Sequence, residues 1–434
     1  MAPGHVDVRV ARGADGTIRI DAGPGLRRVE AYGDAVAAGP AFTRAVLDVA
    51  GAVLTWPVLG DPGMPSAEVH DAGRAQQWVW ALYGERVAAA VHDCAAGQAG
   101  HADARVTAEV TALAGAAARL GLGHWAARWW PTSYADGIPA LEPDLLGLEL
   151  AALTHRCQQL FDDEGDQPDD CVDQLIEEHR AALDPLIQWW RATPQSADAA
   201  RQLEGVLRLI DDAADSAGLD GPALRHLHSS LEGRGPGAAP VDLGALFARR
   251  AGYALAAGEQ LVTGGRVIAR GSGVNDWRRY PPGFVDATEN AVSWTARALG
   301  TLRRIEVEAL ADPAAPTTGI PLVAEVQVNG GGPHRVPLTR RDDLWTGHSD
   351  LSSDLPAGVS APRIEVGVLL PGFDPGPGTP GESDGRAERD AVRALARRRL
   401  AVAARPPAYD ASPHGSCSAP FLAETAATAT DEDY

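Results

Sequence analysis

The residues best suited to hold a metal ion are aspartates at the end of a predicted helix. Asp162, Asp163 and Asp166 follow one another as Asp-Asp-x-x-Asp, and Asp169 and Asp170 come shortly after. Carboxylates at this spacing can share Mg²⁺ ions and through them hold a diphosphate, because hard cations prefer oxygen ligands and keep water for the substrate. The cluster therefore supports one functional hypothesis, a Mg²⁺-dependent enzyme acting on a phosphorylated or isoprenoid diphosphate substrate.

The order Asp-Asp-x-x-Asp resembles the aspartate-rich element of class I terpene synthases, which also lies on a helix of an all-helical fold. That resemblance implies a second metal-binding element downstream, in which Asn-Asp is followed at helical spacing by a hydroxyl residue and a glutamate. The only Asn-Asp here is Asn275-Asp276, and Arg279 and Gly283 stand at the later positions. The sequence carries half of such a site, so a solvated acidic loop is the favoured interpretation.

A second group of potential metal ligands flanks the acidic stretch. His155 and Cys157 precede it, Cys171 and His179 follow it, and all four side chains are types that bind Zn²⁺. Residues two apart on a helix point about 200° from each other, so His155 and Cys157 do not face one ion. Cys157 and His179 also occupy apolar helix positions, which favours packing in a core over metal binding.

The most ordered set of charges is a stripe of arginines on the last predicted helix, about 384–404. Its members are spaced three, four and four residues apart: Arg386, Arg389, Arg393 and Arg397. On an α-helix they fall within about 80° of one another, beside an apolar strip. Guanidinium groups pair bidentately with carboxylates. The stripe therefore predicts docking on an acidic surface, either of a partner protein or of this chain itself.

Other catalytic patterns are missing from the sequence or stand in the wrong context. No Gly-x-Ser-x-Gly occurs, and the stretch Gly121–Ala126, which matches the loose dinucleotide-binding pattern, ends a predicted helix instead of following a strand. All 38 basic residues of the Lys+Arg class are arginine. A chain without lysine has no Schiff-base or pyridoxal-phosphate lysine and no phosphate-loop lysine.

Hydrophobic periodicity predicts an α+β protein of several domains. Apolar and polar residues alternate around Val8 and again around Ile20, which predicts an N-terminal β-hairpin. From about residue 40 the apolar spacing becomes three and four, as in a helical bundle, and Pro185 is expected to end or kink one helix. Beyond about residue 260 the period returns to two, which is typical of an antiparallel sheet with one face on a core.

The expected domains are a β-hairpin segment over 1–39, an all-α helical bundle over 40–262, an antiparallel β-sandwich-like domain over 263–372, a linker with a basic amphipathic helix over 373–404, and a disordered tail over 405–434. The helical spacing is clearest over about 106–120, 146–160, 172–186, 203–217 and 243–254. The tail is rich in alanine, threonine and proline, and poor in large apolar residues.

Composition limits the classes of function. The chain of 434 residues carries a net charge of −20, whose field repels polyphosphates and anionic lipids, so neither nucleic acid nor a membrane is an expected partner. Four cysteines without a CxxC pair favour a reducing, cytoplasmic setting over a disulfide framework. The favoured hypothesis is a non-catalytic scaffold or adaptor, or an accessory subunit of a bacterial multiprotein system such as an NTPase-linked assembly. It binds a protein partner through the arginine stripe and needs no cofactor, whereas the alternative is the Mg²⁺-dependent enzyme.

Overall fold

The computed structural model describes residues 5–22, 40–60, 63–107, 111–161, 172–192, 197–233, 241–247, 266–281, 283–312, 315, 322–351, 362–373, 385–405 and 419–429. The chain divides into two compact units. Unit 1 takes in Met1–Ala127, Leu141–Phe247 and Arg397–Tyr434, and unit 2 takes in Arg128–Ala140 and Ala248–Ala396. The protein is an α+β chain, with an antiparallel sheet and a helical region in unit 1 and a second antiparallel sheet in unit 2.

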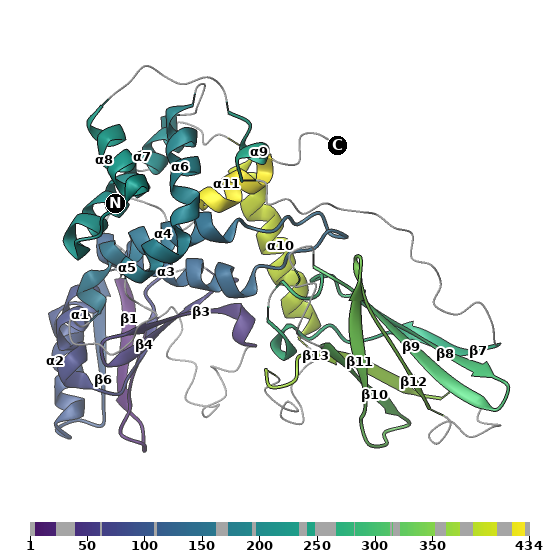
Figure 1. Ribbon diagram of the computed structural model, residues 1–434. Helices are drawn as coiled ribbons and strands as arrows, with labels where there is room; N and C mark the ends of the chain where they lie inside the picture. The colour runs from purple at the N-terminus through teal and green to yellow at the C-terminus, as the bar shows by residue number, and fades with distance from the viewer. Residues whose placement is uncertain are drawn as a thin grey trace. The chain divides into compact units, whose positions relative to one another are not determined.

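Unit 1 begins with a six-stranded antiparallel sheet in the order β3-β4-β5-β2-β1-β6 (Figure 1). Its strands are β1 (His5–Arg12), β2 (Ile18–Ala22), β3 (Arg44–Val49), β4 (Ala52–Pro57), β5 (Ser66–Val69) and β6 (His101–Thr107). β1 and β2 form the expected hairpin, with Val10 opposite Ile20. The other four strands show that the expectation of an all-helical stretch from residue 40 is wrong. β3 alternates buried and exposed side chains over only six residues, too few for a period of two to stand out in alanine-rich sequence.

Two helices follow β5 and cover this sheet. α1 (Ala72–Tyr83) begins after Asp71, whose carboxylate accepts hydrogen bonds from the backbone N–H groups of Gly73 at 3.0 Å and Arg74 at 3.1 Å. This is the capping that an aspartate provides to the first turn of a helix. α2 (Glu85–Ala95) packs on β1 and β6, and α1 packs on α2 (Figure 1).

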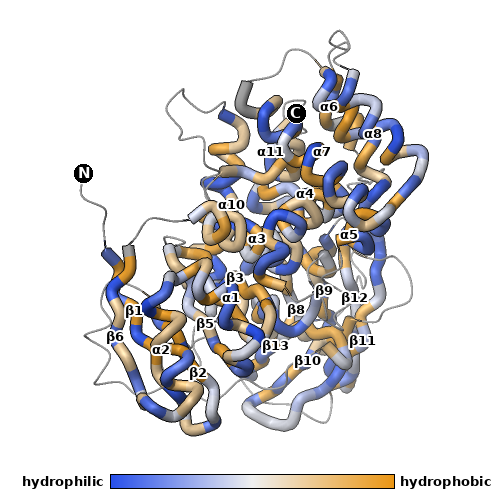
Figure 2. The backbone as a smooth tube through the Cα atoms, turned by 90° about the vertical axis from the view of Figure 1, so that its left-hand side faces the viewer, coloured by the Kyte–Doolittle hydropathy of each residue, from blue (hydrophilic) through white to orange (hydrophobic). Residues whose placement is uncertain are grey.

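The helical region of unit 1 consists of α3 (Ala112–Trp129), α4 (Pro143–Arg156), α5 (Val172–His179), α6 (Leu183–Arg191), α7 (Ala197–Ala217), α8 (Pro222–Glu232), α9 (Leu243–Phe247) and α11 (Leu422–Ala429). Short 3₁₀ turns lie at Ala41–Thr43, Gln158–Leu160 and Arg180–Ala182. Hydrophobic and hydrophilic stretches alternate along α5 to α8 (Figure 2), as expected for helices that bury one face. Two details differ from the spacing-based expectation. Val106 lies in β6, and Pro185 lies in the first turn of α6, where its missing N–H removes no helical hydrogen bond.

Unit 2 contains a seven-stranded antiparallel sheet curled into a half-barrel, in the order β13-β10-β11-β12-β9-β8-β7 (Figure 1). Its strands are β7 (Arg266–Ser272), β8 (Val292–Leu299), β9 (Leu302–Leu310), β10 (Leu322–Val328), β11 (His334–Arg341), β12 (Leu344–Asp350) and β13 (Ile364–Leu369), with a 3₁₀ turn at Trp277–Arg279. The expected antiparallel alternation is present: Ile305, Val307 and Ala309 are fully buried on β9. The expected sandwich of two sheets is wrong, because a single curled sheet encloses this apolar face.

The expected last helix is present as α10 (Arg386–Ala403), and the boundary between the units falls inside it, after Ala396. The expected disordered tail over 405–434 is wrong in part, because α11 lies within it and Phe421 and Leu422 are buried. Two large apolar residues, Phe421 and Leu422, and the alanines after them are buried, although the stretch as a whole has the composition of a tail. Among the residues that the structure describes, no helix is both long and apolar enough to span a bilayer.

Candidate functional site

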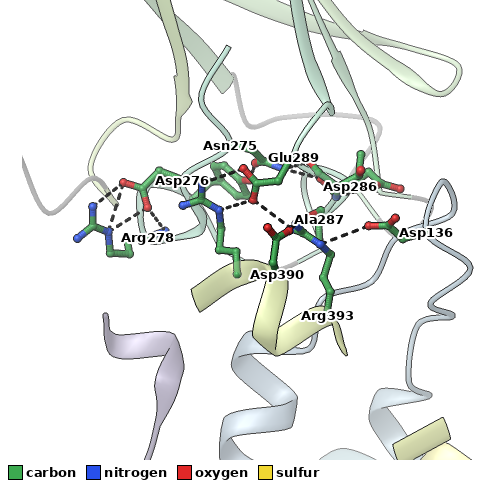
Figure 3. Close-up of polar contacts among 12 residues, drawn as sticks. Asp136, Asn275, Asp276, Arg278, Asp286, Ala287, Glu289, Asp390 and Arg393 are labelled. Atoms are coloured by element: carbon green, nitrogen blue, oxygen red, sulfur yellow. Dashed lines mark hydrogen bonds and ion pairs between the residues drawn. The ribbon is translucent and has the colours of Figure 1, made fainter. Parts of the chain in front are cut away.

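The arginine stripe leads to a cluster of charges in unit 2 (Figure 3). Arg389 is 2% exposed, and its guanidinium forms a fork with the carboxylate of Glu289. The Nε–Oε1 distance is 2.6 Å and the Nη2–Oε2 distance is 2.9 Å. Two short, parallel, charge-assisted hydrogen bonds of this kind fix both partners in one orientation. Glu289 belongs to the segment just before β8, so α10 is fastened to the start of the curled sheet.

Arg393, one helical turn further along α10, joins three different parts of unit 2 (Figure 3). Its Nη1 donates to the backbone carbonyl of Ala287 at 2.9 Å and to Oε1 of Glu289 at 3.2 Å. Its Nε lies 3.4 Å from Oδ2 of Asp136, and Asp390 on the same helix also pairs with it. The side chain is buried, so these partners replace the water that a guanidinium would otherwise hold.

The other two members of the stripe lie elsewhere. Arg386 starts α10 in unit 2 and Arg397 belongs to the part of α10 in unit 1. Both are exposed, and both have contacts of their own within the protein. The two central members of the stripe are therefore buried among carboxylates of the same unit, whereas Arg386 and Arg397 are exposed.

Asp286 organises the loops beside this cluster. Its carboxylate is 1% exposed and accepts three hydrogen bonds, from the Ser133 hydroxyl at 2.7 Å, the Tyr134 backbone N–H at 2.8 Å and the Thr288 backbone N–H at 2.8 Å. The first two donors come from residues 128–140 and the third from the segment before β8. One buried carboxylate thus ties two distant stretches of sequence together.

Asn275 continues this network from the other side. Its Nδ2 donates to the backbone carbonyls of Asp286 at 2.9 Å and Thr288 at 2.6 Å, while its Oδ1 accepts from the hydroxyl of Tyr280. Burial raises the pKa of Tyr280 well above its ordinary value, so this hydroxyl keeps its proton and remains a donor. Asp276, the next residue, caps the turn Trp277–Arg279 and pairs with Arg278. The Asn275-Asp276 pair therefore serves in the scaffold of unit 2.

These loops form the walls of a pocket of about 420 Å³. The part of the wall from residues 128–140 contributes Ala135 and Asp136, the segment before β8 contributes Thr288, Asn290 and Ala291, and the strands contribute Ser293, Glu308, Leu310 and Leu344. This volume is in the range of small-ligand sites. Asp136 carries the Arg393 contact, so the buried cluster and the pocket share a residue.

The lining combines hydrogen-bonding groups with a short apolar floor. Glu308, on β9, is half-exposed, and no ion pair with it is found among the described residues. Among the described residues, the pocket lining contains no histidine, cysteine or arginine. The pocket therefore offers hydrogen-bond acceptors: the Asp136 carboxylate, which pairs with Arg393, and the Glu308 carboxylate, for which the described part of the chain supplies no cation. Hydroxyl and amide groups also line it.

The metal-binding candidates do not gather at this pocket. Asp162, Asp163 and Asp166 lie outside the described residues, as does Cys171. Within the described part of the chain, no group of three or more histidine, cysteine, aspartate or glutamate side chains is placed to hold an ion. His179 lies 3.2 Å from Asp144, and burial raises the pKa of the Cys157 thiol to about 12, so that side chain stays protonated in the core.

The glycines of the dinucleotide-like pattern have a packing role in α3. A Cβ at Gly121 would lie 3.1 Å from the indole ring of Trp56, and one at Gly123 would lie 2.4 Å from Leu150. Both glycines let large side chains approach the helix backbone.

The chain matches no protein-family model, and comparisons with curated proteins and with solved structures give no match either.

Sequence reasoning missed the carboxylates of the pocket and of the charged cluster beside it. Glu289, Asp286 and Asp136 show no periodic or motif signal, because each acts through a partner far away in sequence. The signal nearest to them is the spacing of Arg389 and Arg393 on α10, which predicts docking on an acidic surface and does not indicate which residues supply it.

Proposed function

We propose that this chain is a non-catalytic binding protein, acting as a scaffold or accessory subunit, and that the pocket of unit 2 receives a basic side chain of a protein partner. The observation that supports this best is the Glu308 carboxylate, which lines a pocket of about 420 Å³ without a cationic partner among the described residues. An arginine or lysine from outside would supply the missing cation.

The walls of the pocket are held in place by buried side chains, which favours the binding of a ligand. Its wall at Asp136 is held by Arg393, and its wall at Thr288 is held by Asp286 and Asn275. All three holding side chains are buried. A site whose walls are fixed before the ligand arrives loses less conformational entropy on binding.

The charge of the pocket also favours a cationic ligand. Asp136 and Glu308 stand on its lining, and the whole chain has a net charge of −20. The field of such a protein attracts cations over a Debye length, about 8 Å at physiological salt, and steers a basic partner toward the surface. Apolar contact with Leu310 and Leu344 would accommodate the methylene stem that precedes the charged head of arginine or lysine.

Ligand-observed saturation-transfer NMR on the full chain tests this proposal. N-acetyl-arginine amide is the probe, and the neutral N-acetyl-citrulline amide is its matched control. We expect transfer to the arginine probe, a loss of most of that transfer in Glu308→Gln, and wild-type transfer in Glu388→Gln, which removes a half-exposed carboxylate of the same unit outside the pocket. Equal transfer to the citrulline probe, or an unchanged signal in Glu308→Gln, would refute the proposal.

Docking through the arginine stripe stays a prediction, and the structure changes the variant that tests it. Arg389 and Arg393 are buried in unit 2, so their replacement would disturb the fold itself. The appropriate variant is Arg386→Glu with Arg397→Glu, compared with the wild type in a capture experiment. An identical set of captured proteins would argue against a docking role for this helix face.

The Mg²⁺-dependent alternative also stays a prediction, resting on Asp162, Asp163 and Asp166. Replacing all three by alanine separates the two hypotheses. If Mg²⁺ raises the melting temperature of the wild type and not of this variant, the metal site is supported. If Mg²⁺ has the same effect on both proteins, the acidic stretch is not a metal site.

A further inference from the structure

Residues 419–429, which we name the clip segment, contact the rest of unit 1 in the way that a peptide contacts a receptor. The carbonyl of Ala419 accepts from Nη1 of Arg119 at 2.7 Å and from Nη2 of Arg399 at 3.2 Å. The carbonyl of Pro420 accepts from Nη2 of Arg119 at 3.0 Å and from the side-chain amide of Gln202 at 3.0 Å. Side chains of α3, α7 and α10 thus donate hydrogen bonds to backbone carbonyls of the segment that lie before the start of α11.

The clip segment carries one deeply buried aromatic anchor. Phe421 is 0% exposed, and the guanidinium groups of Arg119 and Arg399 lie 4.6 Å and 5.3 Å from its ring centroid. Cations over an aromatic face are attracted to its π electrons. A Cβ at Gly123 would lie 3.4 Å from the ring, so this glycine of α3 leaves the space that the anchor fills. Interfaces commonly draw most of their affinity from such a buried anchor.

A charged pair next to the anchor gives the segment a defined register. Glu424 is fully buried and forms a fork with Arg399, with Nε–Oε1 at 2.6 Å and Nη2–Oε2 at 2.7 Å. The carboxylate of Glu149, also buried, accepts from the backbone N–H of Ala423 at 3.3 Å in the first turn of α11. A carboxylate at the start of a helix satisfies N–H groups that the helix leaves unpaired.

We propose that the clip segment is a detachable peptide ligand of unit 1, so that the site formed by Arg119, Glu149 and Arg399 also accepts the same segment from a second copy of this chain. The contacts described above are side chain to backbone, aromatic anchor and charged fork, which are the elements of peptide recognition. Because the segment belongs to the same chain as its site, its effective concentration there is high, which favours the copy from the same chain. The proposal does not depend on the pocket of unit 2.

The test uses the full chain with a site-specific protease sequence inserted between Arg405 and Ala419. A fluorescently labelled synthetic peptide of residues 418–430 is added before and after cleavage. We expect no uptake by the intact chain, and saturable uptake with micromolar affinity after cleavage, as the unlabelled segment is released. Cleaved protein that aggregates, or that retains its own segment without exchange, would show that residues 419–429 are an inseparable part of the core.

Peptide variants test recognition without disturbing the fold of the receptor. We expect Phe421→Ala and Glu424→Gln peptides to bind at least tenfold more weakly, and a Thr428→Ala peptide to bind as the wild type does. On the receptor, Arg399→Ala should weaken binding at least tenfold, whereas Arg398→Ala, the exposed neighbour on α10, should not change it. Equal affinities for all peptides would overturn the proposal even if Arg399→Ala does not fold.

Discussion

Helix α10 carries a buried arginine–glutamate fork in each unit, and the surroundings of the two forks differ. Arg389 pairs with Glu289, which a second arginine, Arg393, also contacts at 3.2 Å. Arg399 pairs with Glu424, for which no other ion pair is found among the described residues. The Arg389–Glu289 fork belongs to a branched network beside a pocket. The Arg399–Glu424 fork binds the clip segment, which comes later in the sequence. The same pair of residue types thus shapes a site in one unit and fastens a segment in the other.

The comparison predicts that the Arg399 fork is the more fragile of the two. In Arg399→Ala the fully buried Glu424 loses its cation, which costs about 3–5 kcal/mol, whereas Glu289 in Arg389→Ala keeps its contact with Arg393. Hydrogen exchange measures this directly. At about 1.4 kcal/mol per factor of ten, protection over residues 419–429 should fall at least a hundredfold in Arg399→Ala. The loss in unit 2 of Arg389→Ala should be smaller, and Arg398→Ala should match the wild type. A larger loss for Arg389→Ala would reverse the comparison.

The site of the clip segment contains a carboxyl group with a strongly raised pKa, that of Glu149. Burial is the main cause that raises the pKa of this carboxyl to about 7, against the lowering effects of Arg119 and of backbone N–H groups of the clip segment, while Glu424 adds to the increase. Arg399, the other charged group of this cluster, lies next to Arg119 and Glu424.

The native state therefore holds the Glu149 proton more tightly than the unfolded chain, whose carboxyl has a pKa near 4.5. The stability contributed in this way is complete below about pH 4.5 and is lost as the pH rises toward 7, by roughly 3 kcal/mol at about 1.4 kcal/mol per pKa unit. Glu149→Gln, which has no such proton, should lack this dependence. Unfolding free energies of the two proteins between pH 4.5 and 8 measure the difference, and parallel curves would contradict the expectation.

In unit 2, we expect Asp286→Asn to destabilise the pocket wall without leaving a buried charge unpaired. An amide keeps only one acceptor oxygen for the three donors Ser133, Tyr134 and Thr288, so we expect a loss of about 1–3 kcal/mol. The matched control is Asp342→Asn, in the exposed turn between β11 and β12. We expect faster hydrogen exchange over residues 132–138 and weaker transfer to the arginine probe. Unchanged exchange in that segment would show that Asp286 does not hold the pocket wall.

The long helices could be predicted from the sequence, whereas the short strands and the pocket could not. Long amphipathic stretches such as α7 and α10 follow from spacing alone, because a helix that buries one face must repeat its apolar residues every three or four positions. Short strands such as β5, with four residues, carry too few repeats to be distinguished. The pocket wall depends on the hydrogen bond between Ser133 and Asp286, which are 153 positions apart in sequence and meet only after the sheet and the loop have folded. No local pattern specifies such a meeting.

Two glycines of the helical region, Gly123 on α3 and Gly205 on α7, test how closely the clip segment is fitted to its site; we expect this effect to be the smallest. A Cβ at Gly123 would lie 2.4 Å from Leu150 and 3.4 Å from Phe421, whereas a Cβ at Gly205 of α7 would meet no described residue within 4 Å. Alanine favours a helix over glycine by about 1 kcal/mol, so Gly205→Ala should raise the free energy of unfolding by that amount. Gly123→Ala gains the same propensity but forces an overpacked contact, and overpacking typically costs about 1–3 kcal/mol. We expect it to be destabilised by about 1 kcal/mol, with protection lost over residues 419–429 first. If both variants are equally stabilised, Phe421 does not depend on the space at Gly123, and the anchor of the clip segment is less closely fitted than the contacts of unit 1 indicate.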